Sequence, residues 1–182
     1  MKKRPVLVPA LALLAGLGGC ATHAAPPLDT SRIPDELRAA PDAHLDEVLT
    51  ARGQSVYECR RDGAVRIWWR EGELATLVDR HRRSIGTVTP GDHFIAYDDS
   101  SVSTRRDAVA QVTAGTLVWS RSVAKDAGKP GARMAAQRRF SRTSVVQRID
   151  TTGGLPPDAL CEREGGTLLV PYSATYLFYS PR

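Results

Sequence analysis

The chain has 182 residues, of which 42% are hydrophobic and 25% are charged, and its formal net charge is +5. This length suffices for one domain with a buried core. Lys2, Lys3 and Arg4 lie in a segment that we expect to be removed, and subtracting their three charges from +5 leaves +2. Because this net charge is only weakly positive and the sequence has no basic stripe, we expect no nucleic-acid partner.

The first 20 residues have the organisation of a bacterial export signal. Lys2 to Arg4 form a positive start, and Val6 to Leu17 is an apolar run too short to span a bilayer comfortably. The run ends in Leu17-Gly18-Gly19-Cys20, which resembles a lipobox, where the signal is cut before a cysteine that receives lipid. We expect a lipoprotein signal peptide over residues 1–19. The alternative is an ordinary signal peptide cut between Ala21 and Ala25, which would give a secreted protein.

A lipid on Cys20 would anchor the chain to a membrane. Each buried CH₂ contributes about 0.8 kcal/mol, so more than one acyl chain gives stable attachment. By resemblance to known lipoproteins, Ala21 directly after the cysteine favours release to the outer membrane. Residues 20–32 are small, polar and proline-bearing, as is typical of a tether. Residues 33–182 would then form a single β-rich domain that faces the periplasm.

Two cysteines, Cys59 and Cys161, remain after the signal. Because export leads to an oxidising compartment, we expect a disulfide between them, closing a loop of about 100 residues. Two buried free thiols are the alternative. No Cys-x-x-Cys or His-x-His spacing occurs in the sequence, so we expect no zinc site, and we assign no metal or other cofactor.

One segment, Ile33 to Arg52, has helical spacing. Leu45, Val48 and Leu49 lie at i, i+3 and i+4, and Gly53 would end the helix. We therefore expect a short N-terminal helical segment before the first strand.

From Gln54 onward the hydrophobic pattern alternates with a period of two. Glycine, proline and aspartate turns, among them Asp62-Gly63 and Glu71-Gly72, separate the alternating stretches at intervals of about ten residues. This spacing predicts an all-β fold, a single antiparallel β-sandwich or barrel-like domain. The stretches that we expect to be strands are 54–59, 65–70, 74–78, 84–88, 93–97, 108–113, 116–120 and 144–149.

The C-terminal run from Leu168 to Tyr179 alternates most regularly. Every second residue from Leu168 onward is apolar or aromatic, with Tyr172 and Tyr176 among them. The pattern predicts a half-buried strand, or two strands that bend at Pro171. We expect the rest of the fold to pack on this run.

Several short runs from about Gly53 to the C-terminus resemble one family. The most specific is QRIDTTGG at 147–154, which is similar to Q-R-x-N-T-x-G-G in the family and has Asp150 in place of the asparagine. The other runs are GQSVYEC at 53–59, DHF at 92–94, DSSV at 99–102, Trp119, Cys161 and PYSATYLFY at 171–179. The chain thus resembles domain of unknown function 3455, an uncharacterised exported family of bacteria and fungi. This resemblance implies export and carries no established activity.

The densest group of chemically useful residues is Asp92, His93, Asp98 and Asp99. A histidine near carboxylates can act as a general base or as a metal ligand. We prefer a simpler interpretation, a histidine that begins a strand between two turns whose aspartates cap backbone amides. We therefore assign no catalytic residue and keep His93, Asp92 and Asp99 as the candidates.

The adjacent Trp68 and Trp69 must point to opposite faces of one strand, so at least one of them should be partly exposed. With Arg80, Arg82 and Arg83 they form our candidate binding patch, which would suit an envelope polymer or a partner protein. The alternative is that the tryptophans belong to the core and the arginines to an ordinary solvated surface.

These features favour a non-catalytic binding or structural module of the cell envelope, held at the outer membrane by its lipid. The alternative is a small periplasmic hydrolase or metal-dependent enzyme that uses His93 with the nearby aspartates. We interpret Arg148, within the QRIDTTGG run, as a structural residue paired with an interior carboxylate or with backbone carbonyls.

Overall fold

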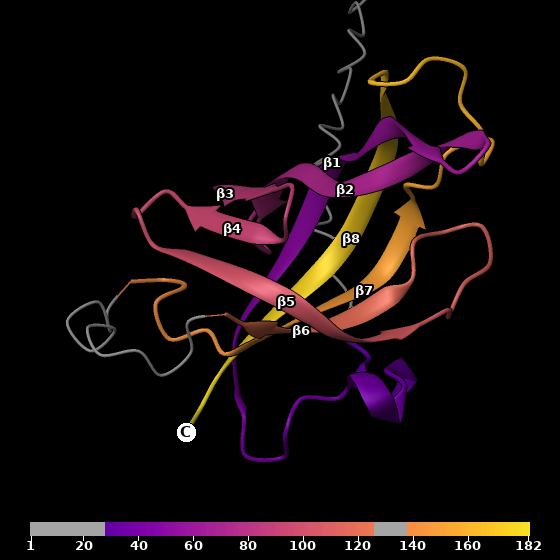
Figure 1. Ribbon diagram of the computed structural model, residues 1–182. Coiled ribbons are helices and arrows are strands. Elements are labelled where there is room, and N and C mark those ends of the chain that lie inside the picture. The colour runs from indigo at the N-terminus through magenta and orange to yellow at the C-terminus, as the bar shows by residue number, and fades with distance from the viewer. Residues whose placement is uncertain (1–27, 126–137) are drawn as a thin grey trace, which may run out of the picture.

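The chain forms a closed barrel of eight antiparallel strands, seen in a computed structural model that describes residues 28–125 and 138–182 (Figure 1). Each strand pairs with its neighbours in sequence, and the last strand pairs with the first. The all-β, barrel-like fold expected from the sequence is confirmed. The strands are β1 (His44–Asp62), β2 (Val65–Val78), β3 (Ser84–Thr89), β4 (His93–Ala96), β5 (Ser101–Ala110), β6 (Trp119–Ala124), β7 (Val145–Gly153) and β8 (Thr167–Ser180).

The helix expected over residues 33–52 is wrong. That region holds only the 3-10 turn η2 (Asp35–Leu37) and the first part of β1, while a second such turn, η1 (Thr30–Arg32), precedes it. β1 pairs with β2 on one side and with β8 on the other, so both edges of its backbone are hydrogen-bonded. Leu49 is fully buried, whereas Val48 is 39% exposed, so the helical spacing of these residues does not mark a shared face. Strand pairing overrides the local pattern here.

One end of the barrel interior is filled with aromatic side chains. Phe178 stacks on Phe140 with 4.6 Å between ring centroids and meets Phe94 edge-on at 5.2 Å. Phe140 comes from the loop before β7, so this loop closes the end at which β8 finishes. An eight-stranded barrel has room for its own side chains or one small ligand. Among the described residues, aromatic side chains therefore occupy this end of the interior.

A second apolar cluster covers the outside of the barrel. Ile33 and Leu37, from the N-terminal turns, pack against Trp119, Ile149 and Leu177. All five side chains are nearly or completely buried. β7 and β8 are therefore buried on both faces, which explains why alternate burial is lost in the middle of these strands.

The N-terminal part of the described chain is held by hydrogen bonds as well. The side-chain amide of Gln147 donates to the carbonyl of Leu37, and Arg121 donates to the carbonyl of Arg38 over 3.0 Å. The lipobox at Cys20 lies outside the described residues. No helix within residues 28–125 and 138–182 is long and apolar enough to cross a membrane.

Candidate binding pocket

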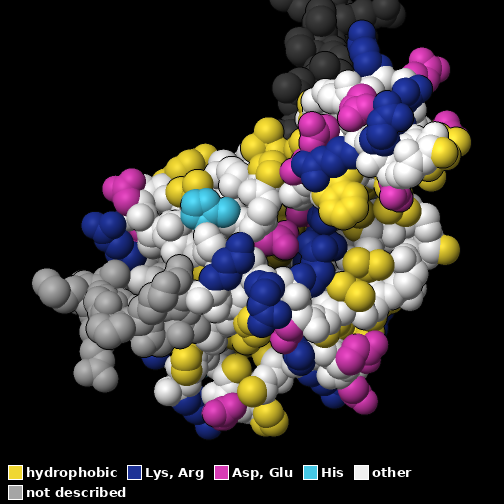
Figure 2. All heavy atoms as spheres, viewed as in Figure 1, with side chains coloured by type: hydrophobic (Ala, Val, Ile, Leu, Met, Phe, Trp, Pro, Cys, Tyr) yellow, Lys and Arg dark blue, Asp and Glu magenta, His cyan; other side chains and the backbone are white. Residues whose placement is uncertain are grey.

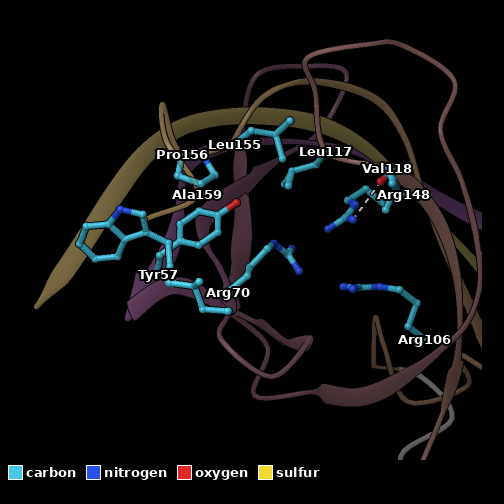
Figure 3. Close-up of a pocket in the computed structure, with 11 residues that line it drawn as sticks. Tyr57, Arg70, Arg106, Leu117, Val118, Arg148, Leu155, Pro156 and Ala159 are labelled. Atoms are coloured by element: carbon cyan, nitrogen blue, oxygen red, sulfur yellow. Dashed lines mark hydrogen bonds between the residues drawn. The ribbon is translucent and has the colours of Figure 1, made fainter. Parts of the chain in front are cut away.

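A pocket of about 430 Å³ occupies the open end of the barrel. On the face of the molecule in Figure 2, basic side chains gather near the middle with hydrophobic side chains beside them. Apolar and aromatic residues make up most of the pocket wall, and three arginines make up the rest (Figure 3). The lining residues are Tyr57, Ile67, Trp68, Arg70, Arg106, Leu117, Val118, Arg148, Leu155, Pro156 and Ala159.

The three arginines come from strands that are far apart in the sequence. Arg70 lies on β2, Arg106 on β5 and Arg148 on β7, and their guanidinium groups point toward a common space (Figure 3). A β-bulge follows each of them within one or two residues. Bulges interrupt the alternation of side chains and re-aim them, and they are enriched at functional sites. The barrel thus brings three cations to one place by three local irregularities.

The bulge in β2 shows how such an irregularity builds the site. Tyr57 pairs with Arg70 and Val56 with Gly72, so Glu71 is an extra residue. The turn expected at Glu71-Gly72 is therefore wrong, and β2 runs through it as one strand. Gly72 has φ 142°, and a Cβ there would lie 2.9 Å from the Cα of Pro90. Because of the extra residue, Arg70 and Glu73, three apart, both face the interior instead of opposite faces.

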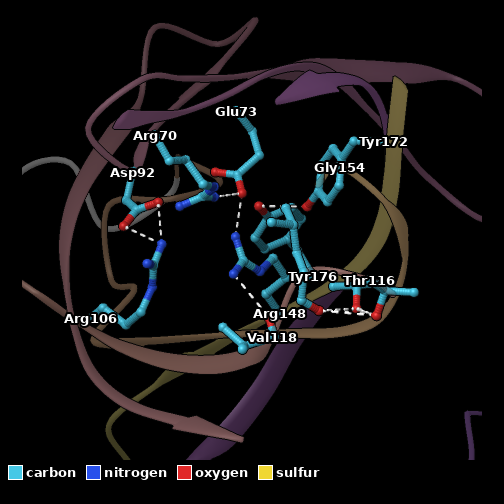
Figure 4. Close-up of polar contacts among 12 residues, drawn as sticks. Arg70, Glu73, Asp92, Arg106, Thr116, Val118, Arg148, Gly154, Tyr172 and Tyr176 are labelled. Atoms are coloured by element: carbon cyan, nitrogen blue, oxygen red, sulfur yellow. Dashed lines mark hydrogen bonds and ion pairs between the residues drawn. The ribbon is translucent and has the colours of Figure 1, made fainter. Parts of the chain in front are cut away.

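Two carboxylates neutralise part of this charge (Figure 4). One oxygen of Glu73, which is fully buried, accepts hydrogen bonds from both Arg70 and Arg148. Arg148 also donates to the carbonyl of Val118 over 2.9 Å. Arg106 donates to both carboxylate oxygens of Asp92, the shorter distance being 3.1 Å. Arg148 therefore has the structural partners expected from the sequence, and it lines the pocket besides.

The balance of charge in this cluster is positive. Three guanidinium groups face two carboxylates, which leaves a formal charge of +1 among Arg70, Arg106, Arg148, Glu73 and Asp92. Burial, reinforced by the positive charges of Arg148 and Arg106, lowers the pKa of Arg70 to about 10. This is the direction expected for a buried cation with like charges beside it.

The loop between β7 and β8 forms the rim of the pocket and is tied to the β1–β2 hairpin. The expected disulfide between Cys59 and Cys161 is present. The hydroxyl of Tyr57 donates to the carbonyl of Gly154 over 2.6 Å, and the backbone N–H of Trp68 donates to the carbonyl of Ala159 over 3.1 Å. Burial raises the pKa of Tyr57, so this hydroxyl keeps its proton and its bond to the rim. Leu155, Pro156 and Ala159 thereby reach the pocket from a loop that is anchored at several points.

The candidate catalytic residues do not meet at this pocket. Asp92 faces Arg106, while the carboxylate of Asp98 accepts hydrogen bonds from Ser100 and from the backbone N–H of Arg139. The bonds from Arg139 and Ser100 lower the pKa of Asp98 to about 2, as expected for a carboxylate that caps a turn. His93 is half-buried at the start of β4, and Asp99 is exposed. Among the described residues, no group of three or more His, Cys, Asp or Glu side chains could hold a metal ion.

The candidate binding patch is also divided. Trp68 lines the pocket, whereas Trp69 is 52% exposed on the outer surface with Arg60 over its ring, 5.6 Å from the centroid. Arg80, Arg82 and Arg83 follow the end of β2, eleven or more residues beyond Trp69, whereas the tryptophans lie near the start of that strand. Of the patch, only Trp68 belongs to the pocket.

Sequence reasoning missed Arg70, Glu73 and Arg106. The spacing of Arg70 and Glu73 was visible, but on a regular strand residues three apart face opposite sides. Only the glycine at position 72 hinted at a bulge. Nothing in the sequence near Arg106 marks it as an interior residue, because its partner Asp92 lies in the β3–β4 turn.

The fold and the pocket define a class of protein, a closed barrel of eight antiparallel strands with a pocket lined mainly by apolar and aromatic side chains. Residues 39–180 match a family described as "Protein of unknown function (DUF3455)". The chain belongs to this family, in agreement with the resemblance noted in its motifs. Comparison with curated proteins and with solved structures finds no match for the chain.

Proposed function

We propose that this protein is a non-catalytic binding module that holds a small molecule with an apolar body inside the open end of the barrel. The observation that carries this proposal is the pocket of about 430 Å³, walled mainly by apolar and aromatic side chains. Ligand pockets have volumes of about 300–1,000 Å³ and mostly apolar walls with a few polar groups. Closed eight-stranded barrels hold single small ligands in the same place.

Binding is favoured over catalysis by what the pocket contains. The described residues that line the pocket do not include His93, Asp98 or Asp99. The polar groups that are present bond mainly to one another, as the pairs of Glu73 and Asp92 show. General acid–base chemistry needs a proton donor or acceptor free to reach the substrate. Arginines paired with carboxylates suit recognition better.

We also propose that the module is a lipoprotein of the outer membrane, facing the periplasm. The disulfide between Cys59 and Cys161 supports an oxidising compartment outside the cytoplasm. Replacing Cys20 with alanine should abolish labelling of the protein with a radioactive fatty acid and release it from the membrane fraction. A wild-type protein that stays with membranes but takes up no fatty acid would contradict the lipid anchor.

Trp68 and Trp69 are adjacent and face opposite sides of β2. Substituting each in turn tests whether a ligand binds inside the pocket. The probe is N-phenyl-1-naphthylamine, a neutral dye whose fluorescence rises in apolar surroundings. Trp68→Ala should weaken dye binding by about 1–2 kcal/mol, roughly five- to thirtyfold, because it removes apolar wall area from the pocket. Trp69→Ala is the matched control and should leave the affinity unchanged. Equal losses in the two variants, or no binding to the wild type, would contradict an interior site.

A further inference from the structure

The pocket carries an excess of positive charge that its own residues do not balance. Glu73 is shared by Arg70 and Arg148, and Asp92 serves Arg106, so three cations have two anions between them. Arg148 is only 2% exposed, and a lone buried charge is costly in a protein. An anion placed in the pocket would complete the pairing.

The arginines also have hydrogen-bonding capacity left over. The Nε atoms of Arg70, Arg106 and Arg148 are buried and have no hydrogen-bond partner among the described residues. Buried polar atoms are nearly always paired, so unpaired ones need a reason such as a missing ligand. Arg66 Nε and Glu73 Oε2 are among the other buried atoms without a partner. The three Nε atoms of the pocket differ in that they lie on the side chains that converge in Figure 3, so unused donors surround one space.

Resting on the proposed binding function, we infer that the ligand is an organic monoanion, with one carboxylate among Arg70, Arg106 and Arg148 and an apolar body along the pocket wall. Guanidinium groups match the planar geometry of a carboxylate and can bind it with two parallel hydrogen bonds. The wall for the apolar body is supplied by side chains such as Trp68, Leu117 and Leu155.

The charge of the cluster and the volume of the pocket narrow the class of ligand further. A carboxylate of charge −1 cancels the formal +1 of the cluster, whereas a phosphate monoester, at about −1.5 to −2, would overshoot it. At about 30 Å³ for each water-sized group, a cavity of about 430 Å³ accommodates roughly 14 such groups. Decanoate, with ten carbons and two oxygens, is therefore a suitable probe.

The first experiment compares three ligands of equal chain length on the full chain by isothermal titration calorimetry. Decanoate should bind at least about tenfold more tightly than decanol, since a hydrogen bond to a charged group contributes more than one to a neutral group. It should also bind more tightly than decyl phosphate. Equal binding of decanoate and decanol would overturn the inference but leave the proposed function standing. Binding of neither would overturn both.

The second experiment uses two arginine–aspartate pairs that differ mainly in where they lie. Arg106–Asp92 faces the pocket, and Arg121–Asp107 joins β6 to β5 away from it. The distance from the arginine nitrogen to the aspartate oxygen is 3.1 Å in both pairs, and both arginine side chains are 29% exposed. Arg106→Gln should weaken decanoate binding at least about tenfold and weaken decanol binding by a much smaller factor. Arg121→Gln should change neither.

Substituting the aspartates should change decanoate affinity in the opposite direction. This distinguishes a contact with the ligand from a structural role. Asp92→Asn raises the formal charge of the cluster to +2 and should tighten decanoate binding, while Asp107→Asn should have no effect. Asparagine suits this position because the backbone of Asp92 is left-handed, with φ 55°. Thermal melting of each variant shows whether it is folded. If Asp92→Asn weakens decanoate binding, or if Arg121→Gln weakens it as much as Arg106→Gln, the carboxylate site is overturned.

Discussion

Replacing Glu73 with glutamine is expected to lower the free energy of unfolding by about 3–5 kcal/mol, the usual cost of breaking a buried ion pair from one side. The side chain is fully buried and accepts hydrogen bonds from both Arg70 and Arg148. Without its charge, two guanidinium groups remain in the interior with no anion between them. Urea denaturation followed by tryptophan fluorescence measures the change.

A matched substitution shows whether burial is the reason. Glu58→Gln removes a carboxylate that pairs with Arg60 at 2.7 Å on the surface, where the Glu58 side chain is 41% exposed. Exposed ion pairs contribute about 0–1 kcal/mol, so this variant should unfold nearly as the wild type does. A loss for Glu73→Gln as small as that of Glu58→Gln would contradict the buried network.

The same substitution should act on binding in the other direction. Glu73→Gln raises the formal charge of the cluster from +1 to +2, so the folded variant should bind decanoate more tightly while being less stable. A gain in affinity together with a loss of stability is expected where a binding site holds a charge that only its ligand balances. A network that served stability alone would lose stability without gaining affinity.

The sequence predicted most of the strands because their signal is local. The strands expected at 108–113 and 116–120 are misplaced, since β5 is Ser101–Ala110 and β6 is Trp119–Ala124. The alternation from Leu168 to Tyr176 reflects one face toward the barrel interior. Between Val65 and Trp69, both of these end residues are exposed, so the apolar alternation there does not mark the interior face. The turn at Asp62-Gly63 joins β1 to β2 as expected, with Gly63 at φ 59°. β8 continues through Pro171 and pairs with β1 and β7, so the run expected to organise the fold does lie between two partners.

The misassigned helix and turn have the same physical origin. The stretch from His44 to Arg52 and the pair Glu71-Gly72 were read from local spacing alone. Their conformations depend on partners on other strands, Ser173–Ser180 of β8 for the first and Val56 of β1 for the second. Pairing across the barrel decides both, and a single sequence does not reveal it.

The site was harder to predict than the fold for a related reason. Its arginines come from β2, β5 and β7, and only closure of the barrel brings them together. Arg148 could be placed in the interior because apolar residues flank it on one strand. Arg70 and Arg106 have the sequence surroundings of surface arginines, because the bulges that follow them are not evident from the sequence.

Loss of the disulfide is expected to be as damaging to stability as loss of Glu73. Cys59 and Cys161 are 102 residues apart, and closing a loop of this length stabilises the folded state by about 4–5 kcal/mol through the entropy of the unfolded chain. Small domains have only about 5–15 kcal/mol in total. The double variant Cys59→Ser/Cys161→Ser should therefore unfold at much lower urea, and reduced wild type should match it. Reductant should not affect the variant; a further loss on reduction would point to another cause.

The folded double variant should nevertheless keep its affinity for N-phenyl-1-naphthylamine within about twofold, since the chain-entropy effect of a disulfide acts on the unfolded state. The rim loop has other attachments that survive the substitution. Tyr57 still donates to Gly154 at 2.6 Å, the backbone of Trp68 to Ala159 at 3.1 Å, and that of Cys161 to Arg66 at 3.1 Å. Titration of the dye at urea concentrations well below the transition tests this. A large loss of affinity there would mean that the disulfide itself holds Leu155, Pro156 and Ala159 against the ligand.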